Sequence, residues 1–317
     1  MNKALNYCDI ILKHKKSIVG SRDECDITQS LGGFKFTTPV TISNMKSVQT
    51  QDICKKFDDH GWFYVYHRID GPSDILSFVE RANKENWRVI SISVGIKVED
   101  INLLKTIKDH SLRVDFITID VALSFTDSIK KIIDCVKINF PRAYLICGNG
   151  ATGEWIEFLE NLGVDCAKMG IGVSDACRTR QYTGFGSTTV SSLIECVGAA
   201  KNIKIMSDGG LTMRNGEVWI GDIAKALALG SQFVMSGSLF SKCADSPAIS
   251  SGYFGNASQI AKGNKTHIEG TSITVQTNGL TIEEQMDLIE DSLKSSVSYS
   301  GGRNILALRE VEANLVK

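Results

Sequence analysis

One cysteine stands where a backbone loop could hold it as a nucleophile. Residues 169–180 read MGIGVSDACRTR, so Cys177 follows a glycine-punctuated stretch, with Arg178 beside it and Thr179 two positions further on. The thiolate is the nucleophilic form of cysteine, and it forms most readily in polar, partly exposed surroundings. The alternative is that Cys177 is one more small apolar side chain. The loop on its own leaves both interpretations open.

The remaining cysteines argue against two other uses of sulfur. The chain has nine cysteines, an odd number, and no two of them form a CxxC pair. This pattern fits neither a disulfide framework nor a structural zinc site. Five of them stand in apolar runs, and we expect these to be buried core thiols: Cys8, Cys135, Cys147, Cys166 and Cys196.

Eight short apolar or β-branched runs predict the strands that would position such a loop. They cover residues 38–44, 61–68, 89–95, 116–122, 143–149, 165–171, 204–210 and 232–238. Segments of helical periodicity separate them, among them residues 74–86, 100–110, 128–140, 153–163, 187–200 and 221–230. This alternation predicts an α/β fold, a single (β/α)8 TIM barrel over residues 1–317. A doubly wound open sheet competes, but no GxGxxG opens a helix after the first strand.

The expected carboxyl ends of these strands are rich in glycine and polar residues. The last two read SDGG at 207–210 and MSGS at 235–238, and an earlier one carries Asp120. In parallel barrels the chemistry gathers at this edge, and bare backbone N–H groups after the last two strands commonly bind phosphate. These ends alone would also suit a phosphosugar or flavin enzyme on the same barrel.

Composition narrows the range of partners. The 317 residues are 43% hydrophobic and 22% charged with a net charge of −1, and basic residues are scattered apart from HKK at 14–16. This distribution lacks the electrostatic footprint of nucleic-acid binding. No apolar run approaches the roughly 18 residues that span a bilayer. We therefore expect a globular cytoplasmic protein that binds neither nucleic acid nor membrane.

An ordered set of motifs resembles the IMP dehydrogenase/GMP reductase family, and lies closest to its GMP reductases. The set covers almost the whole chain, and its most specific members are the cysteine loop KMGIGVSDACRTRQYTGFG, then SDGG, then FVMSG and then YFGNAS. Further matches are DIILKHKKSIVGSR, SNMKSV, YHRID, ITIDVA, ICGNGATGE and THIEG. Each motif alone is weak, and their order makes the resemblance specific.

The resemblance implies reductive deamination of GMP to IMP and ammonia at the expense of NADPH. A cysteine adds to purine C2, the amino group leaves, and hydride reduces the resulting thioimidate. Cys177 matches the nucleophile, while Thr179 and Glu269 match the residues that provide the proton for ammonia. Such a donor is needed because an amide anion is a very poor leaving group in water.

The resemblance also implies binding residues. The purine nucleotide would contact Asp208, Gly209, Gly210, Gly237, Ser238, Gly255, Asn256, Ala257 and Gly270. NADPH would contact Ser21, Arg22, His67, Asp120, Val121 and Ala122, the first two reaching it from a neighbouring subunit of a homotetramer. An arginine beside the 2′-phosphate would distinguish NADPH from NADH. A monovalent cation such as K⁺ would lie on carbonyls of Gly172, Ser174 and Cys177.

Two features favour the reductase over the dehydrogenase branch of the family. The dehydrogenase uses an arginine in a late flap to activate water, and this chain has no arginine between Arg214 and Arg303. Only about twenty residues separate YHRID from VISISVG, which leaves no room for the CBS insertion. We expect an N-terminal arm over about 1–36 and a mobile flap over about 240–285. The alternatives are IMP-dehydrogenase-type oxidation and a nucleotide-binding paralogue without turnover.

Several residues depart from the family pattern around the expected pocket. Leu123 and Ser124 replace Asn-Gly or His-Gly, Lys46 replaces Asp or Gln, and Ser174 replaces a glycine of the cation loop. Residues 213–220 enlarge the loop after SDGG, and Asn-Gly within them predicts a tight hairpin turn. These changes leave the identity of the guanine nucleotide open, with dGMP or a modified guanine nucleotide as alternatives to GMP.

Overall fold

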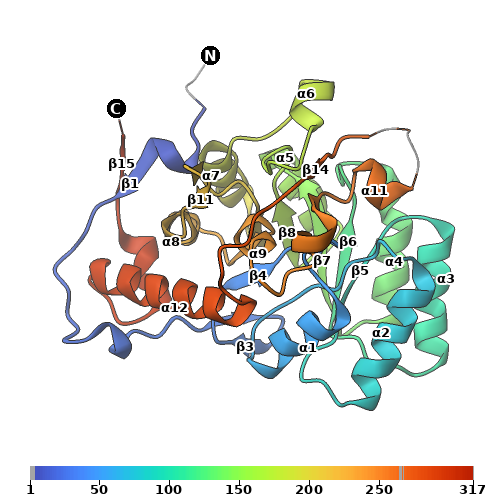
Figure 1. The fold of residues 1–317 in the computed structure, drawn as a ribbon. Coiled ribbons are helices and arrows are strands. Elements are labelled where there is room, and N and C mark those ends of the chain that lie inside the picture. Colours follow the sequence, from blue (N-terminus) through green and yellow to red (C-terminus); the bar gives the residue numbers. More distant parts are fainter. Residues whose placement is uncertain (1–3, 264–265, 267, 317) are drawn as a thin grey trace.

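Seven parallel strands form one curled sheet in the computed structural model, which describes residues 4–263, 266 and 268–316 (Figure 1). Their order is β4-β12-β9-β8-β7-β6-β5, which follows the chain from β5 to β12 and then returns to β4. That order is typical of a sheet that curls toward closure. The strands are β4 (Val40–Ile42), β5 (Ser91–Val94), β6 (Phe116–Asp120), β7 (Tyr144–Gly150), β8 (Cys166–Met169), β9 (Lys204–Asp208) and β12 (Phe233–Ser236).

The expected eighth strand, residues 61–68, is not a regular strand. It touches both edges of the sheet through single parallel bridges, from Phe63 to Thr41 of β4 and from Tyr66 to Ile92 of β5. Side chains take part in these contacts, because the Thr41 hydroxyl donates to the Phe63 carbonyl over 2.7 Å. The α/β sheet is therefore barrel-like, with an irregular segment between its two edge strands.

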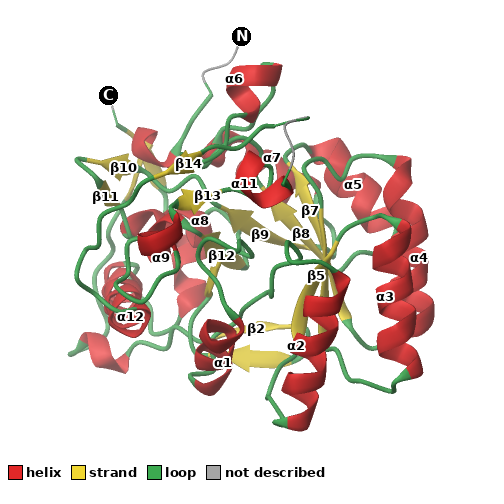
Figure 2. Ribbon diagram, turned by 45° about the vertical axis from the view of Figure 1, so that its right-hand side comes forward, coloured by secondary structure: helices red, strands yellow, loops and turns green. Residues whose placement is uncertain are grey.

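Helices cover the outer face of the sheet (Figure 2). In α2, Ile75, Phe78, Val79 and Ala82 are buried at helical spacing, and Pro72 occupies the first turn, where its missing N–H costs nothing. The sequence predicted six helices close to their observed bounds, and α1 and α12 were not among them. The long helices are α1 (Gln51–Asp59), α2 (Pro72–Lys84), α3 (Val98–Asp109), α4 (Lys130–Asn139), α5 (Gly153–Asn161), α7 (Thr189–Ala199), α8 (Gly221–Ala228) and α12 (Ile282–Tyr299).

Aromatic side chains fill the amino-terminal end of the sheet interior. A hairpin of β2 (Gln29–Leu31) and β3 (Phe34–Phe36) inserts Phe36, which lies 5.2 Å from the ring of Phe63 and 5.7 Å from that of Phe233. Phe116, the first residue of β6, packs against Phe63 at 4.9 Å. This end of the sheet is therefore closed by packing, and the opposite, carboxyl end is left for a site.

Smaller elements lie around this body. Near the chain ends β1 (Ile10–Leu12) pairs with β15 (Ala313–Leu315), while β10 (Met213–Arg214) and β11 (Glu217–Val218) form the predicted hairpin, with Asn215 and Gly216 at positive φ. The others are α6 (Thr179–Thr183), α9 (Ser238–Ser241), α10 (Ala248–Ser251), β13 (Tyr253–Phe254), α11 (Gln259–Lys262) and β14 (Ser272–Ile273).

Two expected segments extend beyond the described residues. Residues 1–3 of the expected arm, and 264, 265 and 267 of the expected flap, lie outside them. Residues 70–89 hold little besides α2, so no CBS domain is inserted there. Among the helices of the described residues, none has the length and hydrophobicity to span a bilayer.

Candidate active site

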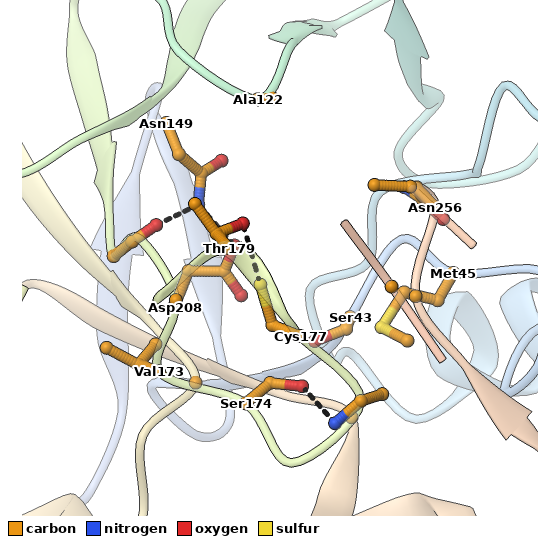
Figure 3. Close-up of a pocket in the computed structure, with 18 of the residues that line it drawn as sticks. Ser43, Met45, Ala122, Asn149, Val173, Ser174, Cys177, Thr179, Asp208 and Asn256 are labelled. Atoms are coloured by element: carbon orange, nitrogen blue, oxygen red, sulfur yellow. Dashed lines mark hydrogen bonds between the residues drawn. The ribbon is translucent and has the colours of Figure 1, made fainter. Parts of the chain in front are cut away.

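A pocket opens at the carboxyl ends of the parallel strands, where the sequence predicts it. Its walls come from the segments that follow β4, β6, β7, β8, β9 and β12, together with residues 253–257 and 269–270. Cys177 lies within it, with Asp208 on one side of the view in Figure 3 and Met45 and Asn256 on the other. The same pocket thus collects residues that are more than 200 positions apart in the chain.

The thiol, a hydroxyl and a carboxylate form a hydrogen-bonded series. Cys177 Sγ lies 3.2 Å from Thr179 Oγ1, as the dashed line in Figure 3 marks, and Thr179 Oγ1 donates to Glu269 Oε2 over 2.8 Å. Because the Thr179 hydroxyl gives its proton to Glu269, its lone pairs face the sulfur, and the thiol is the donor in that contact. The arrangement connects the thiol proton to a carboxylate through one hydroxyl.

Backbone pairing holds the cysteine loop against the segment that carries Glu269. Arg178 N–H donates to the Glu269 carbonyl over 2.6 Å, and Thr271 N–H donates to the Ala176 carbonyl over 2.9 Å. Glu269 and Gly270 N–H groups both donate to the Ala257 carbonyl, at 3.1 and 3.2 Å. A Cβ on Gly270 would lie 2.7 Å from the Ser258 nitrogen, so only glycine fits here. Three distant segments are thereby fixed to one another at the pocket.

Glycines line the part of the pocket expected to hold phosphate. Gly210 has φ +74°, and a Cβ there would lie 2.2 Å from Thr189 Cγ2; at Gly237 it would lie 2.7 Å from the Tyr253 hydroxyl. Bare N–H groups at such positions are suited to an anion. Gly209 is an exception, because its N–H donates to the Met235 carbonyl over 2.9 Å. All of the expected nucleotide contacts, including Ser238, Gly255, Asn256 and Ala257, line the pocket.

A buried lysine that sequence reasoning missed lies on the pocket floor. Lys168, only 2% exposed, donates to Asp208 Oδ2 and to Asn149 Oδ1, each over 2.6 Å, and lies 3.4 Å from Asp120 Oδ1. Burial is the largest influence and would lower the pKa of Lys168, but Asp208 and Asp120 outweigh it and raise that pKa. The available signal was a lysine inside the otherwise apolar run DCAKMGI.

Asp120 belongs to the same charged group. Arg68 Nε donates to its carbonyl over 2.9 Å, and Asn256 Nδ2 donates to its Oδ2 over 3.3 Å. Burial would raise the pKa of Asp120, but Lys168 and Arg68 outweigh it and lower that pKa. Asp120 is therefore an ionised carboxylate whose oxygens are largely engaged by protein groups. Arg68 and Asn149 are two further pocket residues that the sequence did not single out.

The other expected cofactor residues have different positions. Val121 and Ala122 line the pocket. His67 does not: it is 2% exposed, its Nδ1 has no hydrogen-bond partner among the described residues, and burial lowers its pKa. Ser21 and Arg22 lie elsewhere on the chain, where Arg22 donates to Ser295 Oγ and the Tyr299 hydroxyl at the end of α12. Within one chain, these three residues are not brought to the pocket.

The departures from the family pattern affect the pocket less than expected. Leu123 is 54% exposed, and Ser124 is buried and accepts a hydrogen bond from Trp155 Nε1, so neither lines the pocket. Lys46 pairs with Asp70 over 2.5 Å, and neither residue lines the pocket. Ser174 does not have positive φ, whereas Gly172 does, at +68°. The replacement of glycine at 174 therefore carries no backbone strain.

The loop expected to bind a cation, residues 172–177, is compact. The Ser174 carbonyl accepts a hydrogen bond from Cys177 N–H over 3.0 Å, and a Cβ on Gly172 would lie 2.9 Å from Arg180 Cγ.

The burial of the other cysteines agrees with expectation except at one position. Of the five expected core thiols, four are buried, and Cys8 is exposed in a short 3-10 helix near the N-terminus. Apolar neighbours in sequence do not bury a residue that lies beyond the body of the sheet.

A curled parallel sheet with a thiol, a hydroxyl and a carboxylate at its carboxyl edge defines a barrel-like α/β enzyme. Comparison with known proteins narrows this class. Residues 4–317 match the family model described as IMP dehydrogenase / GMP reductase domain. Three relatives are each named GMP reductase: one from Helicobacter pylori is 37% identical over 99% of this chain and 96% of its own length. Those from Chromobacterium violaceum and Oceanobacillus iheyensis are 40% and 35% identical, over 97% and 100% of this chain and 96% and 97% of their own lengths.

The chain therefore belongs to the IMP dehydrogenase/GMP reductase family and is an oxidoreductase of the GMP reductase type. The resemblance stated from its motifs is confirmed over the full length.

Proposed function

We propose that the protein carries out NADPH-dependent reductive deamination of GMP, giving IMP and ammonia. The observation that carries this proposal is the series Cys177–Thr179–Glu269, which stands in the same pocket as Asp208. A protein that only bound nucleotide would have no use for a thiol whose proton is connected to a carboxylate. The names of the relatives support GMP as substrate.

The deamination step follows from the direction of these hydrogen bonds. Cys177 Sγ bonds to purine C2 and the electron pair of the C2=N3 double bond moves onto N3, while the thiol proton passes through the Thr179 hydroxyl to Glu269. The electron pair on N3 then re-forms the double bond as the bond between C2 and the amino nitrogen breaks. Glu269 returns the proton through Thr179 to that nitrogen, which leaves as ammonia. The purine remains bound to Cys177 as a thioimidate.

The reduction step needs space beside Cys177. NADPH, when bound, supplies the hydride that reduces C2. The sulfur–C2 bond breaks as the hydride arrives, so that IMP leaves and the Cys177 thiolate is regenerated. Val121 and Ala122 line the pocket on the side expected to hold this cofactor, and the buried Asp120 lines the same pocket.

The remaining expectations form part of the same proposal. Because Ser21 and Arg22 lie away from the pocket of their own chain, they would reach the cofactor of a neighbouring subunit in a homotetramer. The segment from 240 to 285, which carries Glu269, would act as a flap over the bound nucleotide. The Gly172, Ser174 and Cys177 carbonyls would bind a monovalent cation such as K⁺.

A substrate panel tests the proposal. The protein is assayed at 340 nm with GMP, dGMP, IMP and XMP, each in the presence of NADPH or NAD⁺. We expect NADPH oxidation with GMP and equal yields of IMP and ammonia. Reduction of NAD⁺ with IMP, without any oxidation of NADPH by a guanine nucleotide, would instead identify a dehydrogenase.

A further inference from the structure

The ammonium group of Lys168 lies between two carboxylates that face different parts of the pocket. We propose that Lys168 is a positioning residue: it holds Asp208 in the orientation that binds the ribose hydroxyls, and it joins Asp208 to Asp120 on the cofactor side. This inference rests on the proposed function, because it assigns the ribose of a purine nucleotide to Asp208. Four observations carry it.

First, the three N–H donors of the ammonium have three acceptors. They are Asp208 Oδ2 and Asn149 Oδ1 at 2.6 Å each, and Asp120 Oδ1 at 3.4 Å. An ammonium group has three donors and no acceptor. Lys168 therefore has no remaining N–H for the substrate, and it acts on the substrate only through the groups that it holds.

Second, Asp208 is held through one oxygen only. Its Oδ2 accepts hydrogen bonds from Lys168 and from Asn149 Nδ2, the latter over 2.9 Å. Among the described residues, no hydrogen bond to its Oδ1 is found, and Asp208 lines the pocket. A carboxylate held in this way presents its free oxygen in a fixed direction, where it accepts hydroxyl protons.

Third, Asn149 is itself fixed. Its amide nitrogen donates to the Gly170 carbonyl over 2.7 Å as well as to Asp208, and its oxygen accepts from Lys168. The amide cannot flip without losing these contacts. Lys168, Asn149 and Asp208 therefore form a closed set of hydrogen bonds at the ends of β7, β8 and β9.

Fourth, charge balance requires a cation at this position. Among the described residues, Lys168 is the one cation that pairs with Asp208, whereas Asp120 also has Arg68 within 3.5 Å. A carboxylate that is largely buried and has no cation beside it strongly destabilises the folded protein. Burial lowers the pKa of Lys168, but Asp208 and Asp120 outweigh burial and keep that pKa raised, so the lysine is held as the cation. Removal of Lys168 would thus release Asp208 more than Asp120.

The test compares nucleotides with and without ribose hydroxyls. Isothermal titration measures binding of GMP and of 2′,3′-dideoxy-GMP to the wild type, K168M and K225M. Lys225 is the matched control, because it pairs with Asp222 over 2.8 Å in a largely buried site away from the pocket. The wild type and K225M should prefer GMP by about 10- to 100-fold, the value of a charged hydrogen bond. K168M should bind the two nucleotides within about threefold.

Three outcomes are distinguished. If K168M weakens both nucleotides equally and keeps the preference for GMP, Lys168 is only structural and the inference is wrong. If the wild type binds no guanine nucleotide, the proposed function itself fails. Should K168M not fold by circular dichroism, K168Q replaces it with the same expected loss of preference, because it too lacks the charge.

A double-mutant cycle gives an independent readout. If Lys168 acts on the nucleotide through Asp208, D208N and the double variant K168M/D208N should bind GMP with equal affinity within about twofold. Losses that multiply would contradict the inference, since they would show that Lys168 acts on the nucleotide by another route.

Discussion

At the scale of single residues, the direction of one hydrogen bond decides the chemistry. Thr179 donates to Glu269 over 2.8 Å, which leaves its oxygen to accept the proton of Cys177 at 3.2 Å. A thiol that only filled space would need no acceptor. In the proposed mechanism, the same hydroxyl takes a proton from the sulfur and returns it to the leaving nitrogen by general acid–base catalysis.

Glu269→Gln tests this proton path. The amide has the shape of the carboxyl group but neither accepts nor returns the proton, so turnover of GMP with NADPH at 340 nm should fall by about 10²- to 10⁴-fold. Hydride passes directly from one carbon to another and needs no proton donor. Single-turnover formation of NADPH from IMP and NADP⁺ requires Glu269 only to take the thiol proton, which water can also accept, so this half-reaction should slow by a much smaller factor than turnover of GMP. Glu283→Gln, on α12, is the control, and its activity should be unchanged.

An equal loss in both directions would contradict this role. It would mean that Glu269 holds the segment or the nucleotide in place, as its backbone contacts with Arg178 and Ala257 would also allow. The proton donor would then have to be another group of the pocket.

The sequence predicted some residues of the site and missed others, and the difference lies in the contacts that each residue makes. The motifs predicted Cys177, Thr179 and Glu269 as site residues. That Thr179 and Glu269, which are 90 positions apart in the chain, lie in contact could not be predicted from the sequence alone. The sequence did not predict Lys168 as a site residue, because its role depends on hydrogen-bond and ion-pair partners from β6, β7 and β9. His67 stands in the right motif, but its side chain is buried outside the pocket.

At the scale of elements, aromatic packing closes the end of the sheet opposite the pocket. Phe116 packs against the rings of Phe34, Phe36, Phe63 and Tyr144, with centroids 4.9 to 6.2 Å away. These rings come from the β2–β3 hairpin, two strands and the irregular segment 61–68. The packing thus holds segment 61–68, which has few backbone bonds to its neighbours, against the strands of the sheet.

Phe116→Ala should leave a cavity at this junction. Loss of a fully buried phenylalanine costs about 3–5 kcal/mol, which urea unfolding monitored by circular dichroism would measure. Ile138→Ala is the control, since Ile138 is 77% exposed on α4 and its truncation should change stability by less than about 0.5 kcal/mol. A loss below about 1 kcal/mol for Phe116→Ala would contradict the importance of this packing.

The strands and helices were largely predictable, and the irregular parts were not. Seven of the eight apolar runs contain strands of the sheet, and the Asn215–Gly216 turn forms as its residue types require. Residues 61–68 have the same composition as the strands, but the Thr41 and Ser93 hydroxyls donate to carbonyls of this segment, and such contacts depend on neighbours that periodicity does not reveal. The pairing of β1 with β15 joins the two ends of the chain and has no local signal either.

At the scale of the whole molecule, the proposed contacts of Ser21 and Arg22 with the cofactor would require a second copy of the chain, because both residues lie away from the pocket of their own chain. Arg22 lies at the end of α12, 5.5 Å from the centre of the Tyr299 ring, and Ser21 precedes it in an exposed turn. Both residues are accessible to a second copy of the chain. This position agrees with a role in a neighbouring subunit.

Arg22→Ala should then raise the KM for NADPH by about 10- to 100-fold and that for NADH by less than about threefold, because only NADPH has the 2′-phosphate. Arg142→Ala is the control, as Arg142 is exposed at the opposite end of the sheet. Coexpression of Arg22→Ala with Cys177→Ala should restore activity in mixed oligomers, where one interface joins an intact Arg22 to an intact Cys177. No recovery, or an equal effect on both cofactors, would contradict the shared site.

The proposed mechanism depends most on Cys177, the group that would bond to the purine. The most direct test is Cys177→Ala, measured for turnover at 340 nm with GMP and NADPH and for GMP affinity by isothermal titration. Because the thiol supplies a covalent bond and little of the binding energy, the variant should bind GMP within about threefold of the wild type while turnover falls more than about 100-fold. Retention of more than about one hundredth of wild-type turnover, with GMP affinity unchanged, would contradict the covalent mechanism.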